Sequence, residues 1–236
     1  MEHTRQWLRR ARRVAVLTGA GVSAESGVPT FRGKDGLWKQ YRPEDLATSE
    51  AFFRDPKLVW QWYNWRRGLV AHAQPNPGHY ALADLERRSK EFTLITQNVD
   101  DLHEQAGSRN VVKLHGDIWQ VRCLACLREW TDTRPCIAEL PPKCGCGGLL
   151  RPGVIWFGEE LGPGVWDRAE KAARKADLLL VVGTSAVVYP AAGLVRLAKC
   201  AGAKVVEINL AETAITSQID AFLCGPCGEL LPKLIA

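Results

Sequence analysis

The sequence predicts an α/β fold in which a doubly wound, Rossmann-like parallel sheet adjoins a smaller lobe made of a helical insertion and a zinc ribbon. Two observations support this prediction. Short apolar runs rich in β-branched residues alternate with helical stretches, and two segments without such runs interrupt the alternation. With 236 residues, of which 46% are hydrophobic and 24% charged, the chain can bury a sizeable core, and a disordered or fibrous protein is excluded.

The predicted strands are nearly continuous apolar runs, which are typical of a parallel sheet covered on both faces. They lie at residues 14–17, 92–96, 111–114, 178–182 and 205–208. Helices are predicted between them at residues 77–88, 165–176 and 191–201. Gly202 follows the last of these helices, where a C-cap glycine belongs. Strands and helices alternate as in βαβ units, so the sheet should be parallel.

The two interruptions should form the smaller lobe beside the sheet. Residues 30–76, which hold four of the nine tryptophans, are predicted to be helices inserted after the first strand, and residues 119–150 a zinc ribbon. The larger lobe would then comprise residues 1–29, 77–118 and 151–236. Because no linker or low-complexity segment separates the lobes, we expect residues 1–236 to form one functional unit.

The charge and the ends of the chain bear on its partners and compartment. A net charge of +5 tolerates an anionic cofactor but is too small to indicate a nucleic-acid partner. No apolar run approaches the roughly 18–20 residues of a membrane helix, and no signal-peptide core follows Met1. We expect a cytoplasmic monomer with reduced thiols. A solvated helix face, rather than a transit peptide, should hold Arg5, Arg9, Arg10, Arg12 and Arg13.

Four of the eight cysteines form two close pairs. Cys123 and Cys126 are separated by two residues, Cys144 and Cys146 by one, and 17 residues lie between the pairs. Two thiolate pairs on tight turns match the tetrahedral preference of Zn²⁺, and four protein ligands would leave no position open for catalysis. We therefore expect one structural zinc ion, against the alternative of reduced structural cysteines. Cys136 could substitute as a ligand but is expected to stand free.

A glycine-rich loop follows the first predicted strand. In the run from Gly19 to Ala24, the glycines permit a sharp turn and the close approach of a pyrophosphate, and a following helix N-terminus would offer N–H groups. The acidic residue that a plain dehydrogenase has about 20 positions later is missing, since position 39 is Lys. The polar ends of later strands, at residues 183–185 and 207–209, are therefore the candidates to hold a ribose.

Together these motifs resemble the sirtuin family. The resemblance rests on GAGVSAESGVPTFR at residues 19–32, QNVD at 97–100, HG at 115–116, the four cysteines, and GTS at 183–185, in that order and spacing. It extends from about residue 13 to the C-terminus. It implies an NAD⁺-dependent protein-lysine deacylase with a Rossmann lobe and a small zinc lobe.

The resemblance also assigns residues to the cofactor and the chemistry. In this family the acyl oxygen attacks the ribose anomeric carbon as nicotinamide leaves, and His115 would then act as general base beside Asn98. Free lysine, nicotinamide and an O-acyl-ADP-ribose would be formed. His79 and His103 lack such support and are expected to be structural. The implied NAD⁺-binding residues are Gly19, Ala20, Gly21, Ser23, Thr30, Phe31, Arg32, Gln97, Asn98, Asp100, Gly183, Thr184, Ser185, Asn209, Leu210, Ala211 and Cys227.

Tyr63 and Arg66 bear on which acyl group is removed. Residues three apart share a helix face, and a phenol and a guanidinium in one pocket would bind a carboxylate. With GVPTFRG at residues 27–33, the pair resembles the class III branch, whose members remove succinyl, malonyl and glutaryl groups and whose bacterial members also deacetylate. The alternative is that Arg66 and Arg67 coat a helix surface while Tyr63 packs.

The acylated lysine would arrive on a protein substrate. The segment containing Val154, Trp156, Phe157 and Gly158 resembles the family's strand that pairs with the substrate backbone, so the peptide would add a strand between the lobes. Two other functions stay open: mono-ADP-ribosyl transfer to protein, and a non-catalytic NAD⁺ sensor or DNA-binding regulator. His115 and Asn98 argue against the sensor.

Overall fold

The computed structural model describes residues 1–32 and 36–236. Gly33, the last residue of the motif that indicates the class III branch, lies outside the described residues. Within the described chain, no helix is long and apolar enough to cross a membrane.

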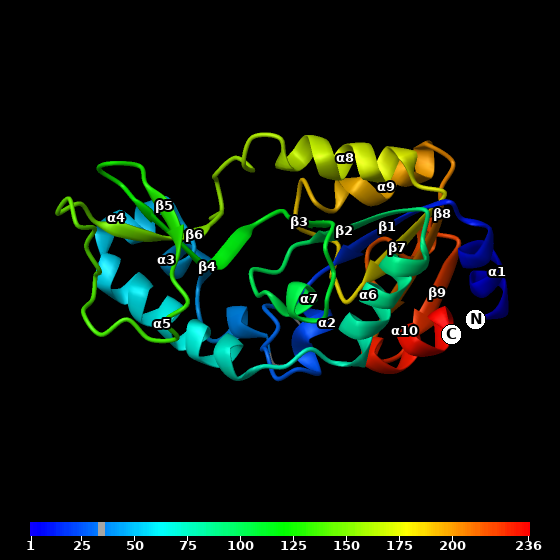
Figure 1. Ribbon diagram of the computed structural model, residues 1–236, viewed down its shortest axis with the longest axis horizontal. Coiled ribbons are helices and arrows are strands. Elements are labelled where there is room, and N and C mark those ends of the chain that lie inside the picture. Colours follow the sequence, from blue (N-terminus) through cyan, green and yellow to red (C-terminus); the bar gives the residue numbers. More distant parts are fainter. Residues whose placement is uncertain (33–35) are drawn as a thin grey trace.

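A six-stranded parallel sheet forms the centre of the larger lobe (Figure 1). Its strands lie in the order β3-β2-β1-β7-β8-β9, and every neighbouring pair is parallel. The strands are β1 (Arg13–Thr18), β2 (Glu91–Thr96), β3 (Val111–Lys113), β7 (Leu178–Val182), β8 (Lys204–Asn209) and β9 (Ala221–Cys224). The parallel α/β fold is therefore confirmed. Strand β9 was not predicted, because it has only four residues and none of them is fully buried.

Helices cover both faces of this sheet, as the continuous apolar runs predict. On one face, Val14 and Val16 pack with α6 (Pro77–Arg88) and α10 (Cys227–Ile235), and the N-terminal helix α1 (Glu2–Arg10) contacts α10. On the other, Ala15 and Leu17 pack with α8 (Val165–Lys175) and α9 (Gly193–Cys200). The four strand residues are at most 4% exposed, so β1 is buried on both faces.

The smaller lobe lies at the other end of the molecule (Figure 1). Its antiparallel sheet has the order β5-β4-β6, with β4 (Gly116–Cys123), β5 (Glu129–Thr131) and β6 (Leu150–Val154). Its helices are α3 (Pro43–Leu46), α4 (Ser49–Arg54) and α5 (Pro56–His72), after a 3₁₀ turn at Leu37–Lys39. One apolar cluster joins the two parts, since it contains Phe52 and Val59 from the helices together with Ile118 and Val121 from the sheet. The insertion and the ribbon thus share a core.

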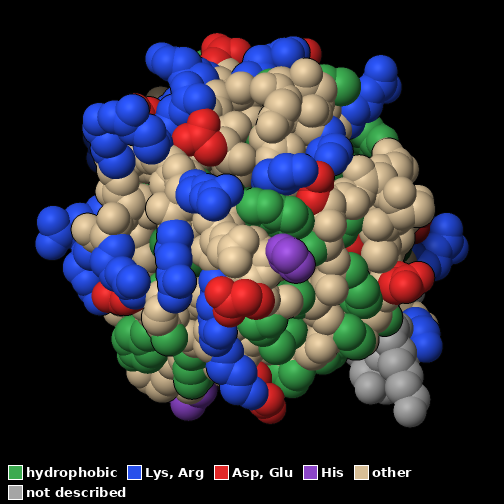
Figure 2. Space-filling model, turned by 90° about the vertical axis from the view of Figure 1, so that its right-hand side faces the viewer, with side chains coloured by type: hydrophobic (Ala, Val, Ile, Leu, Met, Phe, Trp, Pro, Cys, Tyr) green, Lys and Arg blue, Asp and Glu red, His purple; other side chains and the backbone are tan. Residues whose placement is uncertain are grey.

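The far side of the larger lobe carries charge but none of the predicted site residues. Figure 2 shows Lys and Arg side chains spread over the end of the molecule where both termini lie.

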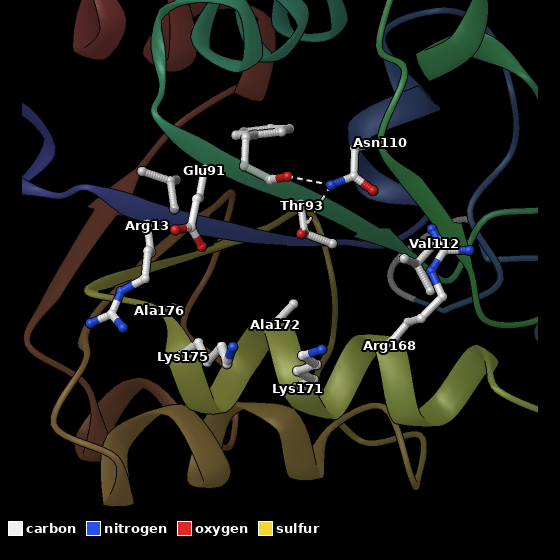
Figure 3. A pocket seen from close by; sticks show the side chains of 12 residues that line it. Arg13, Glu91, Thr93, Asn110, Val112, Arg168, Lys171, Ala172, Lys175 and Ala176 are labelled. Carbon is white, nitrogen blue, oxygen red and sulfur yellow. Dashed lines mark hydrogen bonds between the residues drawn. The ribbon is translucent and has the colours of Figure 1, made fainter.

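A cavity of about 370 Å³ opens between α8 and the beginnings of β1 and β2 (Figure 3). Arg13 and Glu91 line it at the first residue of each strand, whereas the predicted cofactor residues Gly19 and Gln97 follow the opposite ends of the same strands.

Candidate active site between the lobes

The carboxyl ends of β1 and β7 meet where the strand order of the sheet reverses. β2 and β3 continue the sheet on one side, and β8 and β9 on the other. Open α/β sheets bind their ligands in the crevice at such a point. Here the loop after β1 contacts the loop after β7, and the Gly21 N–H donates to the Gly183 carbonyl at 2.8 Å.

The glycines of the first loop are required by this contact. A Cβ on Gly19 would lie 2.7 Å from the Thr184 Cβ, and one on Gly21 would lie 2.7 Å from the Gly183 oxygen. Both separations are too short for real Cβ atoms, so larger residues would push the loops apart. The sequence suggested the approach of a ligand as the reason for these glycines, and the structure adds the approach of a second loop. The helix that follows, α2 (Gly21–Ala24), is a single turn.

A buried polar network lies directly behind the glycine-rich loop. The Ser23 hydroxyl donates to Asp100 Oδ2 at 3.1 Å and accepts from Asn98 Nδ2 at 3.0 Å. The three residues are at most 7% exposed. Burial raises the pKa of Asp100, against the opposing effect of hydrogen bonds from the Leu102 N–H and from Ser23. The structure therefore brings Ser23 of the glycine-rich loop together with Asn98 and Asp100, which follow it by 75 and 77 positions, and the motifs predicted all three for NAD⁺.

His79 joins this network, which the sequence did not predict. Its Nδ1 accepts the backbone N–H of Asn76 at 3.2 Å, so Nε2 carries the hydrogen and faces the Ser23 hydroxyl oxygen at 3.5 Å. Burial lowers the pKa of His79 to about 4, so the ring is neutral at ordinary pH. The available signal was the capping box that Asn76 and His79 form at the start of α6. His103 is buried 4.8 Å from the His79 ring centre.

His115 stands at the end of β3 with one ring nitrogen fixed. A carbonyl only accepts hydrogen bonds, so the 3.0 Å contact with the Gln97 carbonyl places the hydrogen on Nδ1. Burial lowers the pKa of His115 below its ordinary value, with the Gln97 carbonyl opposing the change. The ring is therefore mainly neutral near pH 7, and its Nε2 lone pair can accept a proton.

The polar ends of β2, β7 and β8 are joined to one another. Gln97 Nε2 donates to the Thr184 hydroxyl at 2.9 Å, and Asn209 Nδ2 donates to the Thr184 carbonyl at 2.9 Å. Ser185 is half-buried beside them, while Leu210 is 69% exposed. Gln97, Thr184 and Asn209 are thus joined at the carboxyl ends of β2, β7 and β8.

Cys227 and the loop at residues 30–32 were also predicted to contact the cofactor. Cys227 is 4% exposed at the first residue of α10, and burial raises the pKa of its thiol to about 12. A neutral buried thiol is inert. In the loop, the Thr30 hydroxyl donates to the Arg32 carbonyl at 2.9 Å, and Phe31 is half-buried. The Arg32 and Ala211 side chains are exposed.

Helix α5 is anchored to the ribbon by one polar face. Trp60 Nε1 donates to the Leu150 carbonyl at 2.8 Å, and Asn64 Nδ2 to the Ile137 carbonyl at 2.8 Å. Arg67 donates to the Asp132 carbonyl at 2.7 Å and to Ile118 O at 3.0 Å. With 1% exposure, Arg67 is an internal anchor. The alternative in which Arg66 and Arg67 coat a surface is therefore wrong.

Tyr63 and Arg66 lie on the neighbouring face of α5 and are 3% and 8% exposed. The Arg66 guanidinium carbon lies 4.7 Å from the Phe31 ring centre and 5.0 Å from that of Trp62. Within the described chain, Arg66 has neither a hydrogen bond nor an ion pair. Burial lowers the pKa of Arg66, while attraction to Tyr63 and to the Asp100 carboxylate opposes the change. The Arg66 side chain is therefore within electrostatic reach of Asp100, a residue of the polar network behind the glycine-rich loop.

The segment predicted to receive the substrate backbone is mostly irregular. Only Val154 belongs to β6, which ends there, and Phe157 forms an isolated parallel bridge with Thr48. Gly158 has a φ of 85°, which few other residues adopt. A continuous strand over residues 154–158 is therefore absent, because the backbone turns between Trp156 and Glu159, where the Glu159 N–H donates to the Trp156 carbonyl at 3.1 Å. Phe157 remains 42% exposed beside the crevice.

The four paired cysteines converge at the end of the ribbon. Their sulfur atoms all lie within 4.8 Å of one another, with Cys123 and Cys146 3.5 Å apart and Cys126 and Cys144 3.8 Å apart. Tetrahedral zinc with bonds of about 2.3 Å separates its sulfur ligands by about 3.8 Å, so the cluster fits the ion. Cys136 is not in the cluster and contacts Asn64 instead. A structural zinc site with four ligands is thus confirmed.

Comparison with known proteins agrees with this geometry. The model of the Sir2 family matches residues 19–190. The "NAD-dependent protein deacylase 2" of Pyrobaculum aerophilum is 57% identical over 226 residues, covering 95% of this chain and 90% of that protein. A Sir2 homologue solved as an NAD complex superposes with a TM-score of 0.94 at 51% identity, covering 100% and 92%. A Sir2 structure with a p53 peptide and NAD⁺ gives a TM-score of 0.90 at 31% identity, covering 100% and 97%.

Proposed function

The chain belongs to the Sir2 family, and from this premise we propose that it is an NAD⁺-dependent protein-lysine deacylase that removes succinyl and malonyl groups as well as acetyl. Its products would be free lysine, nicotinamide and an O-acyl-ADP-ribose. The main support for the acidic acyl groups is the buried pair Tyr63 and Arg66, whose hydrogen-bond donors find no acceptor among the described residues.

The crevice fits NAD⁺. The paired loops at Gly21 and Gly183 leave the backbone bare of side chains, as the close approach of a pyrophosphate requires. Asn98 and Asp100 would hold the nicotinamide end, and Thr184 and the residues around it the other ribose. When bound, NAD⁺ would supply the electrophilic ribose carbon that receives the acyl oxygen.

His115 would move the proton in this reaction. Because Nδ1 is fixed on the Gln97 carbonyl, Nε2 is the atom that accepts a proton from a ribose hydroxyl. Its lowered pKa keeps the base unprotonated near pH 7 and so ready to act. His79, with a pKa of about 4, would hold the Ser23 hydroxyl in place, which keeps that hydroxyl directed at Asp100.

The acyl end of the substrate would complete the pocket at Arg66. Leaving a buried cation unpaired costs several kcal/mol, and a carboxylate offers the partner that the pocket lacks. A bidentate bond between the guanidinium and a carboxylate, with the Tyr63 hydroxyl added, would favour succinyl-lysine. Acetyl-lysine has no charge for Arg66 to bind, so its removal should be the slower reaction.

The lysine would reach the crevice on a peptide that lies along residues 156–158. The exposed Phe157 and the open backbone at Gly158 border the crevice between the lobes, where the peptide could pair its backbone. The zinc site would take no part in the chemistry, because its four cysteines leave no open position. Its role would be to hold the ribbon on which α5 is anchored.

Mass spectrometry of one succinyl-lysine peptide with and without NAD⁺ tests the proposal. We expect the peptide to lose its succinyl group only with NAD⁺, with release of nicotinamide. Transfer of ADP-ribose to protein without loss of the acyl group would show a transferase instead. The absence of turnover on both succinyl and acetyl peptides would contradict the proposal and favour a non-catalytic NAD⁺ sensor.

A further inference from the structure

Tyr63 is held by a neighbour that fixes the direction of its hydroxyl group. Trp156 Nε1 lies 3.0 Å from the Tyr63 oxygen, and an indole N–H can only donate. The phenol oxygen therefore accepts this bond, so its own hydrogen does not point at Trp156. No second partner of the Tyr63 hydroxyl occurs in the part of the chain that the structure describes. The buried hydroxyl hydrogen is thus left to donate to a ligand.

Trp156 is itself fixed by an ion pair. Arg151 Nη1 and Nη2 donate to the two oxygens of Glu159 at 2.6 and 2.9 Å, and the Arg151 guanidinium carbon lies 3.7 Å from the Trp156 ring centre. Glu159 Oε2 also accepts the backbone N–H of Trp156 at 2.9 Å. Both the ring face and the backbone of Trp156 are therefore held by this pair.

The pair is well suited to a fixed role because it is largely buried. The side chains of Arg151 and Glu159 are 14% and 21% exposed. Although burial opposes it, hydrogen bonds from Arg151, from the Trp156 N–H and from Ser49 lower the pKa of Glu159. The carboxylate stays ionised near pH 7, so the indole is held in one orientation. Phe52 packs 5.2 Å from the Trp156 ring centre.

We propose that Arg151 and Glu159 are positioning residues that help to select the acyl group. They act by holding the Trp156 indole, and the indole N–H directs the Tyr63 hydroxyl hydrogen toward an acidic acyl group. This inference rests on the proposed function, since it concerns the same pocket. Removal of the indole N–H would let the phenol turn and would weaken binding of succinyl-lysine more than that of acetyl-lysine. A hydrogen bond to a charged group corresponds to roughly a tenfold effect or more, and a phenol that keeps its hydroxyl but loses its direction should lose up to about that much.

The test compares kcat and KM on succinyl- and acetyl-lysine peptides of one sequence. Trp156→Phe, which keeps the ring but not the N–H, should lower the succinyl-to-acetyl ratio of kcat/KM about five- to tenfold, chiefly through KM for the succinyl peptide. In a Tyr63→Phe background, the same change should alter the ratio less than about twofold, because coupled residues are not additive. Glu159→Gln should lower the ratio, and Arg151→Lys should retain more of it than Arg151→Met.

A matched control uses the ion pair of Glu170 and Arg174 on the surface of α8, in which Arg174 Nε lies 2.7 Å from Glu170 Oε1. Glu170→Gln should leave the ratio unchanged. Thermal unfolding of each variant establishes that it is folded. If Trp156→Phe does not fold, Glu159→Gln replaces it as the variant that tests the positioning role. If the wild type does not act on succinyl-lysine, the proposed function and this inference both fail. If Tyr63→Phe lowers the ratio but Trp156→Phe and Glu159→Gln do not, only the positioning role is overturned. The same holds if the losses caused by Trp156→Phe and Tyr63→Phe add in the double variant.

Discussion

Replacing Arg66 and Arg67 one at a time by methionine should change the stability of the protein in opposite directions. The two residues are adjacent on α5 and both are buried, but among the described residues only Arg67 has hydrogen-bond and ion-pair partners. Arg67 donates two hydrogen bonds of 3.0 Å or less and lies 3.8 Å from the Asp132 carboxylate. Removing one member of a buried, hydrogen-bonded charge network costs about 3–5 kcal/mol.

For Arg67→Met we therefore expect a loss of about 3–5 kcal/mol in the free energy of unfolding. At roughly 2–4 °C per kcal/mol for a chain of this size, the melting temperature should fall by about 6–20 °C. For Arg66→Met, the buried cation without a partner is removed, which is favourable. Its two contacts with aromatic rings are lost, at about 0.5–1 kcal/mol each. The net change should lie between zero and a gain of about 2 kcal/mol.

Urea and thermal unfolding of the zinc-loaded protein, followed by circular dichroism, measure both changes. If Arg66→Met destabilised the protein as much as Arg67→Met, Arg66 would be an anchor, and its pocket would not be short of an acceptor. Arg54→Met, at an exposed ion pair with Asp45, is the control and should change stability by less than about 1 kcal/mol.

Further outcomes follow from the same structure. His115→Ala should abolish deacylation while leaving the melting temperature within a few degrees, as measured by nicotinamide release and calorimetry. Because the pKa of His115 is lowered by burial, the rate should fall only as pH drops below the ordinary histidine value, and a fall beginning above it in the pH profile would contradict this. His79 binds its proton more weakly in the folded state, with a pKa of about 4. The free energy of unfolding should therefore decrease by about 3 kcal/mol as the pH falls from about 6.5 to about 4. In urea titrations, His79→Gln should make this dependence on pH flatter. Removal of zinc with a chelator should lower the melting temperature markedly, whereas Cys136→Ser should keep one zinc per chain by metal analysis.

The larger part of the fold could be predicted from the sequence because burial on both faces leaves a plain pattern. Residues 14–17 and 178–182 are continuous apolar runs, and both form central strands. The edge strand β9 leaves no such pattern, because its residues are only partly buried. The zinc cysteines were predictable from spacing alone, since two close pairs on tight turns need little else to bind zinc.

Parts of the site depend on contacts that no local pattern records. His79 lies on the helix α6, and the capping box that it forms with Asn76 does not show that its other ring nitrogen reaches Ser23. Likewise, the ring of Trp156 reaches Tyr63 across more than ninety intervening residues. The turn from Trp156 to Glu159 is stabilised by the bonds of Glu159, so a continuous strand could not be excluded from the apolar sequence.

The most direct test of the account is the ratio of kcat/KM on succinyl- and acetyl-lysine peptides for the wild type and for Arg66→Met. Loss of the buried guanidinium that would bind the carboxylate should cost about 1.5–3 kcal/mol, which is roughly a 10- to 150-fold fall in succinyl activity. Acetyl activity should change far less. Equal losses on the two peptides, or a wild type that prefers acetyl-lysine, would contradict the assignment of Arg66 to the acyl group.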